Sequence, residues 1–229
     1  MNGLWLSRIR LRQEAPVAAL ARLLVPEGTG PRAAAGHHLI WSVFSDGPER
    51  RRDFLWREEA PGRFLALSAR PPEDATGLFT LESRPFAPVL AAGDRLGFAL
   101  RANPVVSRPA GPGRRGQRHD VVMDALRQVP PGPGRAEERP AKVMEAGRAW
   151  LARQGDRHGF RPDEEVAVDG YERRQVPREG GGMAVFGVLE FEGVLTVEDP
   201  VRFLAALTAG FGKARAFGFG LMLIRRARS

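Results

Sequence analysis

The sequence has no cysteine, no long apolar run and no cluster of metal-binding side chains. Without cysteine the chain forms neither disulfides nor thiolate metal sites, so the reducing cytoplasm is the expected compartment. A membrane-spanning helix needs about 20 apolar residues in a row, and the first residues lack the apolar stretch of a signal peptide. The four histidines are scattered and have no carboxylates grouped around them, so neither a metal nor another cofactor is expected.

Lysine is nearly absent, because Lys142 and Lys213 are the only lysines among the 35 basic residues. The net charge of +8 and the isoelectric point of about 11.2 indicate a polyanionic partner, with nucleic acid first. A GC-rich genome also raises arginine content, but the planar guanidinium suits phosphates and guanine edges better than an ammonium does. A membrane-surface role would need a basic amphipathic helix with exposed aromatic residues, and the sequence shows none.

The first half of the chain alternates between strand-like and helix-like patterns. Apolar residues alternate over 4–11, which predicts a first strand. The remaining predicted elements are helices over 16–24 and 36–44, strands over 54–57 and 63–68 around a turn at 60–62, and a short strand over 78–81.

Prolines and Gly93-Asp94 interrupt the pattern over 85–94, and a second series of elements then begins. The predicted elements are a strand over 95–106, a basic loop over 107–118, a helix over 140–153, strand or hairpin segments over 166–176 and 183–195, a helix over 200–209 and a last strand. This is the split βαβ order of ferredoxin-like domains, which the first half fits more loosely. We therefore predict an α+β protein with two tandem ferredoxin-like (RRM-like) domains, residues 1–88 and 93–229, whose antiparallel sheets carry helices on one face. Nucleic acid would fit in a cleft between them.

Residues 210–220 form a glycine-rich loop with two cations, Gly-Phe-Gly-Lys-Ala-Arg-Ala-Phe-Gly-Phe-Gly. Glycine permits close approach of the backbone, so successive N–H groups can converge on an anion, with the cations beside them. The loop follows a predicted helix and lacks the nucleotide-binding spacing, which favours a phosphate chain over a nucleotide. The alternative is a helix cap followed by a tight turn. The residues predicted to contact phosphate are Gly210, Gly212, Lys213, Arg215, Gly218 and Gly220.

Several blocks, in order along the whole chain, resemble one known family. They are Leu4–Arg8, His37–Phe44, Arg52–Trp56, Leu96–Pro104, Phe191–Leu195 and Gly210–Leu221. On these blocks the sequence is identified as a member of the CRISPR-associated repeat-processing endoribonucleases, in the CasE branch that serves the type I-E surveillance complex, Cascade. The resemblance implies two ferredoxin-like domains and metal-independent cleavage of CRISPR precursor RNA at the base of a repeat hairpin. It also implies that the product RNA and other Cascade subunits remain bound.

His37 is the main candidate for the chemistry of RNA cleavage. Such cleavage uses the 2′-OH of the RNA, and histidine suits the proton transfers because its ordinary pKa lies near neutrality. On a helix His37 shares one stripe with Ile40, Trp41 and Phe44. We expect it at the start of that helix, where the helix dipole would lower its pKa and favour the neutral base. By resemblance, the family's catalytic histidine lies seven residues before this phenylalanine, which is His37.

The sequence departs from some relatives near this histidine. They carry a tyrosine three residues before it and a lysine five residues after it, where this chain has Ala34 and Ser42. His38 and Lys213 are the candidates to replace these groups. The alternative is a catalytically weak or inactive subunit that only binds the RNA hairpin. A small-molecule enzyme with a nucleotide in the glycine loop is a third interpretation, but it would need an acidic residue near that loop.

Two further groups of arginines are predicted to hold the RNA. One follows the first strand of the second domain, and the other belongs to a predicted hairpin that, by resemblance, enters the major groove of the stem. Phosphates would be recognised by charge, and a guanine by a bidentate arginine. The residues are Arg108, Arg114, Arg115 and Arg118 in the first group, and Arg173, Arg174 and Arg178 in the second.

Overall fold

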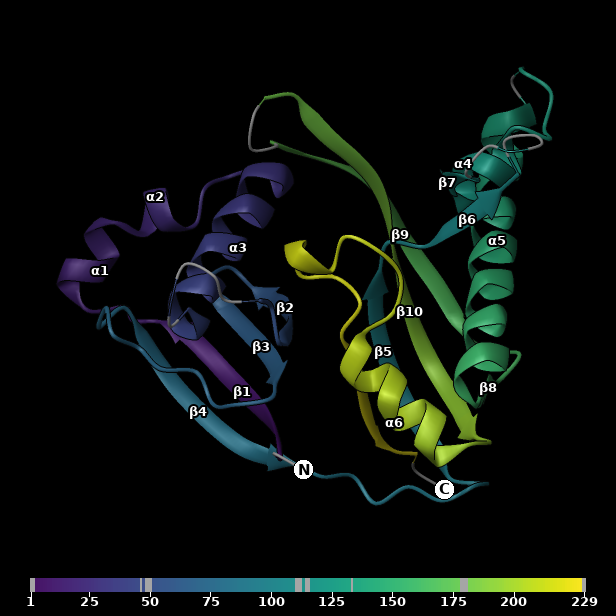
Figure 1. The fold of residues 1–229 in the computed structure, drawn as a ribbon. Helices are drawn as coiled ribbons and strands as arrows, with labels where there is room; N and C mark the ends of the chain where they lie inside the picture. The colour runs from purple at the N-terminus through teal and green to yellow at the C-terminus, as the bar shows by residue number, and fades with distance from the viewer. Residues whose placement is uncertain are drawn as a thin grey trace.

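The computed structural model describes residues 3–45, 47, 51–109, 113, 116–132, 134–177 and 181–227. It is an α+β protein in which two antiparallel sheets lie side by side, each with helices packed on one face (Figure 1). The predicted tandem ferredoxin-like fold is confirmed by the order of the strands in both sheets, which is that of a split βαβ unit.

The first sheet has the order β2-β3-β1-β4. Its strands are β1 (Leu4–Leu11), β2 (Phe54–Ala60), β3 (Arg63–Ser68) and β4 (Phe79–Phe86), after the short helices α1 (Ala15–Ala19) and α2 (Ala21–Leu24) and the long helix α3 (Thr29–Phe44). Helix α3 covers one face, where Ile9, Ile40, Phe44, Trp56 and Phe64 form a buried core.

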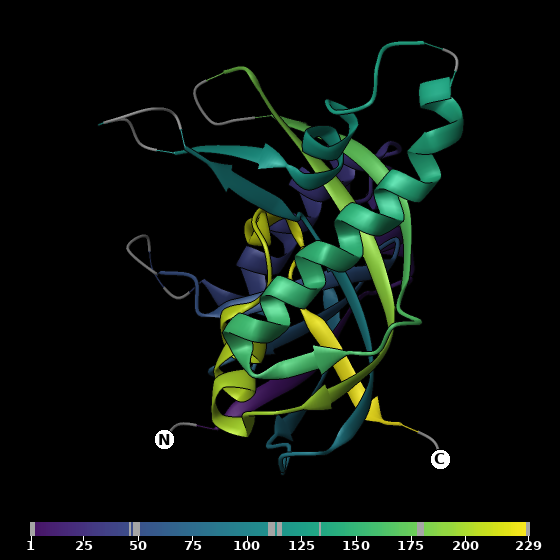
Figure 2. The same ribbon diagram turned by 90° about the vertical axis from the view of Figure 1, so that its right-hand side faces the viewer.

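The second sheet has the order β11-β5-β10-β8, with β9 also paired to β10. Its strands are β5 (Arg95–Ala102), β8 (Phe160–Pro162), β9 (Ala167–Pro177), β10 (Met183–Val197) and β11 (Met222–Arg226), and its helices are α5 (Gly134–His158) and α6 (Pro200–Ala209). Figure 2 shows α5 crossing the face of this sheet. Trp150, Leu151, Phe160, Phe191 and Phe203 are buried between helices and sheet.

The hairpin formed by β9 and β10 extends beyond the second sheet towards the start of α3 (Figure 1). At that contact a Cβ on Gly30 would collide with the carbonyl oxygen of Gln175, so the close approach requires glycine. The first turn of α3 therefore packs against the second half of the molecule.

Several predicted boundaries differ from the structure. Helix α3 begins at Thr29 and not at Gly36, and α5 spans residues 134–158 where 140–153 was predicted. The predicted strand over 95–106 ends at Ala102, and the basic loop forms two short paired strands, β6 (Val105–Arg108) and β7 (Gln117–Asp120), followed by α4 (Val121–Leu126). Proline explains the strand break, because Pro104 has no N–H for the ladder.

A small apolar seam joins the two sheets. Leu55, Leu65 and Leu67 from the first sheet pack with Leu221 next to β11. The strands of the two sheets span residues 4–86 and 95–226, and the division into domains at 88 and 93 stays a prediction. Among the described residues, no helix combines the length and the apolar character that crossing a membrane requires.

Candidate active site

The ring of His37 is held by a backbone carbonyl from the far end of the chain. Its Nδ1 lies 2.9 Å from the carbonyl oxygen of Ala216. A carbonyl only accepts hydrogen bonds, so Nδ1 carries the hydrogen, and in the neutral ring Nε2 then has the lone pair that a general base needs. The contact therefore selects the tautomer suited to proton abstraction.

His37 is not at the start of its helix, and that prediction is wrong. Helix α3 begins at Thr29, so His37 lies about two turns into it. The helix dipole acts mainly on the first turn, so it has little effect on a ring at this position. The ring is instead oriented by the Ala216 carbonyl, which lies beside the middle of α3.

Trp56 fixes the position of that carbonyl. Its Nε1 donates to the same Ala216 oxygen at 3.2 Å. The indole lies between two glycines: a Cβ on Gly36 would come within 2.8 Å of the ring and a Cβ on Gly218 within 2.9 Å. Because neither glycine has a side chain, helix α3 and the glycine loop both approach Trp56 closely. No sequence pattern pointed directly to this role of Trp56.

Aromatic rings surround His37 on its other sides. The ring centroid of His38 lies 5.4 Å away, that of Phe217 5.8 Å and that of Trp41 6.1 Å. His37 is half-buried and His38 is exposed. The two predicted histidines, which are neighbours in the sequence, thus both reach the surface, where a substrate can contact them.

The glycine loop runs from the end of α6 to β11 and contains the 3-10 helix η1 (Arg215–Phe217). Its amides at Phe211, Lys213, Phe217 and Gly220 donate to carbonyl oxygens of the protein. Gly212 has φ +73°, and a Cβ there would lie 2.6 Å from the carbonyl oxygen of Asn103. These observations give the loop a packing role, and its predicted contact with phosphate stays a prediction.

The two loop cations point to different uses. Lys213 is exposed, while its backbone forms a bridge with Asn103. Arg215 is half-buried and donates to the carbonyl of Ala209, at the end of α6. Lys213 therefore remains a candidate for contact with RNA or with the reacting phosphate, whereas Arg215 helps to close the loop.

Ala34 and Ser42 bring no acid or base to His37. The hydroxyl of Ser42 donates to the Leu39 carbonyl at 2.8 Å, a bond within the same helix. In the described part of the chain, no three histidine or acidic side chains lie together as a metal site would require.

The arginines of the β9–β10 hairpin lie on opposite faces of β9. Arg173 is exposed. Arg174 is turned inward, where its guanidinium pairs with Glu172 at 3.1 Å and lies 5.3 Å from the centroid of the Phe219 ring. The third predicted hairpin arginine, Arg178, lies outside the described residues.

The arginines near β6 and β7 divide in a similar way. Arg118 is exposed, and Arg108 is bound to Asp124 by a 2.6 Å ion pair. This pair commits the Arg108 guanidinium to α4, although its side chain remains accessible. Arg114 and Arg115 lie outside the described residues.

A polar pocket that sequence reasoning missed lies one helical turn before His37. It has a volume of about 220 Å³ and is lined in part by Ala33, which precedes His37 by four residues on the same face of α3. We call it the arginine pocket and define it by Arg32, Glu58, Arg101, Arg174, Phe217 and Phe219. Only Arg174 and the glycine loop had been predicted as part of a binding surface.

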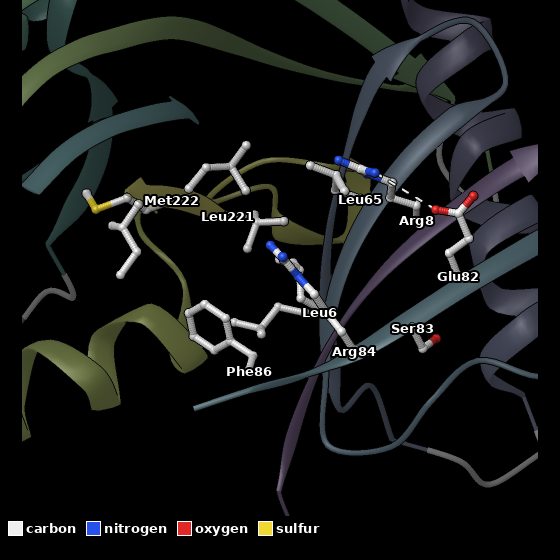
Figure 3. Close-up of a pocket in the computed structure, with 12 residues that line it drawn as sticks. Leu6, Arg8, Leu65, Glu82, Ser83, Arg84, Phe86, Leu221 and Met222 are labelled. Carbon is white, nitrogen blue, oxygen red and sulfur yellow. Dashed lines mark ion pairs between the residues drawn. The ribbon is translucent and has the colours of Figure 1, made fainter. Parts of the chain in front are cut away.

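A second, larger hollow of about 420 Å³ lies along the seam between the sheets (Figure 3). Leu6, Leu65, Leu221 and Phe86 give it an apolar lining, while Arg8 at its side pairs with Glu82. It shares no lining residue with the arginine pocket and includes neither His37 nor Ala216. The candidate active site is therefore the cluster around His37 and the glycine loop.

Comparisons with known proteins show similarity over most of the chain. The family model described as "CRISPR associated protein" matches residues 4–226. The chain is 32% identical over 195 residues to the CRISPR-associated endoribonuclease Cse3 of Thermus thermophilus, covering 77% of this chain and 81% of the relative. It is 25% identical over 192 residues to the CRISPR system Cascade subunit CasE of Escherichia coli K12, covering 81% and 88%.

A solved structure extends the similarity to the whole fold. It is Thermus thermophilus Cse3 bound to an RNA representing a pre-cleavage complex, with a TM-score of 0.68 and 27% identity. The match covers 97% of this chain and 99% of that one. On its sequence and its fold, the chain belongs to the CRISPR-associated protein family, in the branch that contains Cse3 and CasE.

Proposed function

We propose that the protein is a metal-independent endoribonuclease that cleaves CRISPR precursor RNA within its repeats, at the base of the repeat hairpin. The relatives support this reading, because one is named an endoribonuclease and was solved with a pre-cleavage RNA, and another is named a Cascade subunit. After cleavage the enzyme keeps the mature RNA and joins other Cascade subunits in the cytoplasm.

The reaction needs no group outside the RNA and the protein. The 2′-oxygen attacks the neighbouring phosphorus in line, the bond from phosphorus to the 5′-oxygen breaks, and that oxygen takes up a proton. The products are a 2′,3′-cyclic phosphate and a 5′-hydroxyl. A positioned general acid or base contributes about 10²–10⁴-fold to such a step.

The observation that carries the proposal is the bond from His37 Nδ1 to Ala216 O. It orients the ring and selects the tautomer in which Nε2 is the nitrogen that would take the proton of the 2′-OH. His38, with its ring centroid 5.4 Å from that of His37, and the exposed Lys213 are the candidates to donate a proton or to stabilise charge on the phosphorane. A donor aimed at a developing oxyanion contributes about 10²–10³-fold.

The RNA would be held by shape and charge. An RNA stem has a deep, narrow major groove and a ladder of phosphates. The exposed Arg173 and Arg118 suit contacts with phosphates, and the β9–β10 hairpin extends beyond its sheet (Figure 1), as a hairpin that enters a groove would. Arg114, Arg115 and Arg178 belong to the same proposal from their sequence positions.

A catalytically weak or inactive hairpin-binding subunit is the second candidate, because Ala34 and Ser42 supply neither acid nor base. Incubation with a cognate repeat RNA in EDTA separates the two. A discrete fragment with a 5′-hydroxyl supports the enzyme, and a gel shift without cleavage supports the binding subunit. A 2′-deoxy sugar at the scissile position must block cleavage, and cutting of that RNA would contradict attack by the 2′-OH.

A further inference from the structure

The arginine pocket has no part in the proton transfers, yet it adjoins the residues that carry them. Phe217 lines it and also lies 5.8 Å from His37, centroid to centroid. Ala33 lines it one helical turn before His37. This inference rests on the proposed function, in which the scissile linkage of the RNA lies at His37. A group bound in the pocket would therefore lie next to that linkage.

Besides the exposed Glu59, which also lines the pocket, Glu58 is its half-buried acidic group. It lies near the end of β2 and is half-buried, and its Oε1 accepts a hydrogen bond from the Gly62 amide at 3.3 Å. Burial raises its pKa above the ordinary value, although the Gly62 amide and the charges of Arg32, Arg174 and Arg101 oppose the rise. The Glu58 carboxylate therefore offers two acceptor oxygens that are only partly solvated.

Three guanidinium groups from different elements line the pocket together with this carboxylate. Arg101 on β5 pairs with Glu190 and donates from Nη1 to the Glu58 carbonyl at 3.1 Å. Arg174 on β9 is anchored by Glu172. Arg32 on α3 is bonded to the Pro26 carbonyl at 3.4 Å. Each guanidinium is oriented by a neighbour and still lines the pocket.

Aromatic rings form another side of the pocket. Phe217 and Phe219 both line it, and Phe186 packs against both of them, with centroid distances of 5.8 Å and 5.6 Å. Unpaired RNA bases stack on such rings and on arginine planes. The volume, about 220 Å³, is below the 300 Å³ or so at which pockets for drug-sized ligands begin. It suits a single base.

We propose that the arginine pocket binds one unpaired guanine next to the scissile phosphate, with Glu58 accepting hydrogen bonds from its Watson–Crick edge. Guanine presents two adjacent donors there, N1–H and the N2 amino group, which match the two oxygens of a carboxylate. Its O6 and N7 are acceptors that suit arginine. Adenine, cytosine and uracil each place an acceptor beside their donor, and that acceptor would face the carboxylate.

A phosphate fits this pocket less well than a base. Glu58 would repel it, and Phe217 and Phe219 would give it no hydrogen bond. Three arginines against two glutamates still leave a positive charge that attracts RNA as a whole. The pocket thus combines general attraction with selection of one base, and so contributes to the choice of cleavage position.

The test uses repeat hairpins that differ in one unpaired nucleotide on either side of the scissile phosphate, with each of the four bases in turn. Single-turnover cleavage is measured for the wild type, for Glu58→Gln and for Glu145→Gln, an exposed control on α5. Affinities for the same RNAs are measured with His37→Ala, alone and combined with Glu58→Gln. Inosine in place of the guanine removes only the N2 amino group and tests the contact without changing the protein.

At one of the two positions, guanine should raise the cleavage rate or the affinity about tenfold or more, as expected for one bidentate contact to a base. Glu58→Gln should remove this preference, Glu145→Gln should keep it, and inosine should lose much of it. Equal cutting of all the RNAs by the wild type, or a guanine preference that survives Glu58→Gln, would overturn the inference and leave the proposed function standing. If no RNA is cut, the proposed function fails, and the affinities alone decide whether the pocket selects guanine.

Discussion

His37 and Trp56 donate to the same acceptor, the carbonyl oxygen of Ala216, at 2.9 Å and 3.2 Å. His37 belongs to α3 and Trp56 to β2, while Ala216 lies in the glycine loop next to β11. The shared acceptor therefore connects the first sheet and its helix to the loop that leads into the second sheet. It places the loop and the histidine ring relative to each other.

Trp56→Phe should slow cleavage without weakening RNA binding. The phenyl ring keeps most of the packing but loses the N–H that fixes the Ala216 carbonyl. A hydrogen bond of this kind contributes about 0.5–1.5 kcal/mol, so the single-turnover rate should fall about threefold to tenfold. Single-turnover rates and binding isotherms measured in parallel check this split.

The matched control is Trp150→Phe in the core of the second sheet. It also replaces a buried indole with a phenyl ring. It should lower the melting temperature while leaving the cleavage rate near that of the wild type. A rate for Trp56→Phe that equals the wild-type rate would show that the shared carbonyl has no positioning role.

Gly218→Ala should destabilise the protein more than Gly77→Ala does. Both glycines have positive φ, +84° and +70°, where an alanine is strained. At Gly77 a new Cβ meets nothing within 4 Å, whereas at Gly218 it would lie 2.9 Å from the Trp56 ring. Backbone strain costs about 1–3 kcal/mol at either site, and the collision adds to it at Gly218 alone.

Chemical denaturation measures the two free energies of unfolding. Equal losses of unfolding free energy for both variants would show that the loop can move away from Trp56 at little cost. Cleavage by Gly218→Ala should also fall, because the Ala216 carbonyl moves with the loop.

Arg173 and Arg174 should separate binding from stability. Arg173→Ala removes an exposed charge, so affinity for the repeat RNA should fall, and the slope of log affinity against log salt should decrease by about 0.7–0.9 per lost phosphate contact. Arg174→Ala also removes the ion pair with Glu172 and the contact with Phe219. It should therefore lower the melting temperature as well.

Arg153→Ala, an exposed change on α5, is the control for charge alone. Salt titrations by fluorescence anisotropy and thermal melts provide both readouts. An unchanged salt slope for Arg173→Ala would exclude this arginine from phosphate contact.

Glu58→Gln should raise the stability of the free protein, and the gain should grow with pH. Burial raises the folded-state pKa of Glu58 above the ordinary value of 4.5. Its protonated form is thus favoured on folding, and the wild type loses stability relative to Glu58→Gln as pH rises through the folded-state pKa. Below pH 4.5 the two proteins should differ least.

Urea denaturation between mildly acidic and neutral pH measures this difference. A gap in the free energy of unfolding that narrows as pH rises would contradict the direction of the shift.

The sequence was sufficient for the order of strands and helices but not for several boundaries. Alternation over 4–11 and the apolar residues over 200–209 predicted β1 and α6 closely. The start of α3 was missed because Gly30, Ala33 and Gly36 form no apolar stripe. The two glycines instead allow close contact with β9 and with Trp56. The ends of α5 are polar and likewise carry no hydrophobic period.

The candidate site was predicted in part. His37 and the glycine loop do meet, as the choice of Lys213 as a candidate partner requires, but the contact is made by the backbone carbonyl of Ala216. A carbonyl leaves no signature in a sequence, because every residue has one. The arginine pocket was missed for a related reason, since Arg32, Glu58, Arg101 and Arg174 come from four separate elements.

The most direct test of the account is cleavage of a cognate repeat hairpin by His37→Ala in EDTA, with its affinity for the same RNA measured alongside. The account predicts a fall in the single-turnover rate of about 100-fold or more, the contribution of a positioned acid or base, with an affinity close to that of the wild type. Cleavage by His37→Ala at the wild-type rate would contradict it.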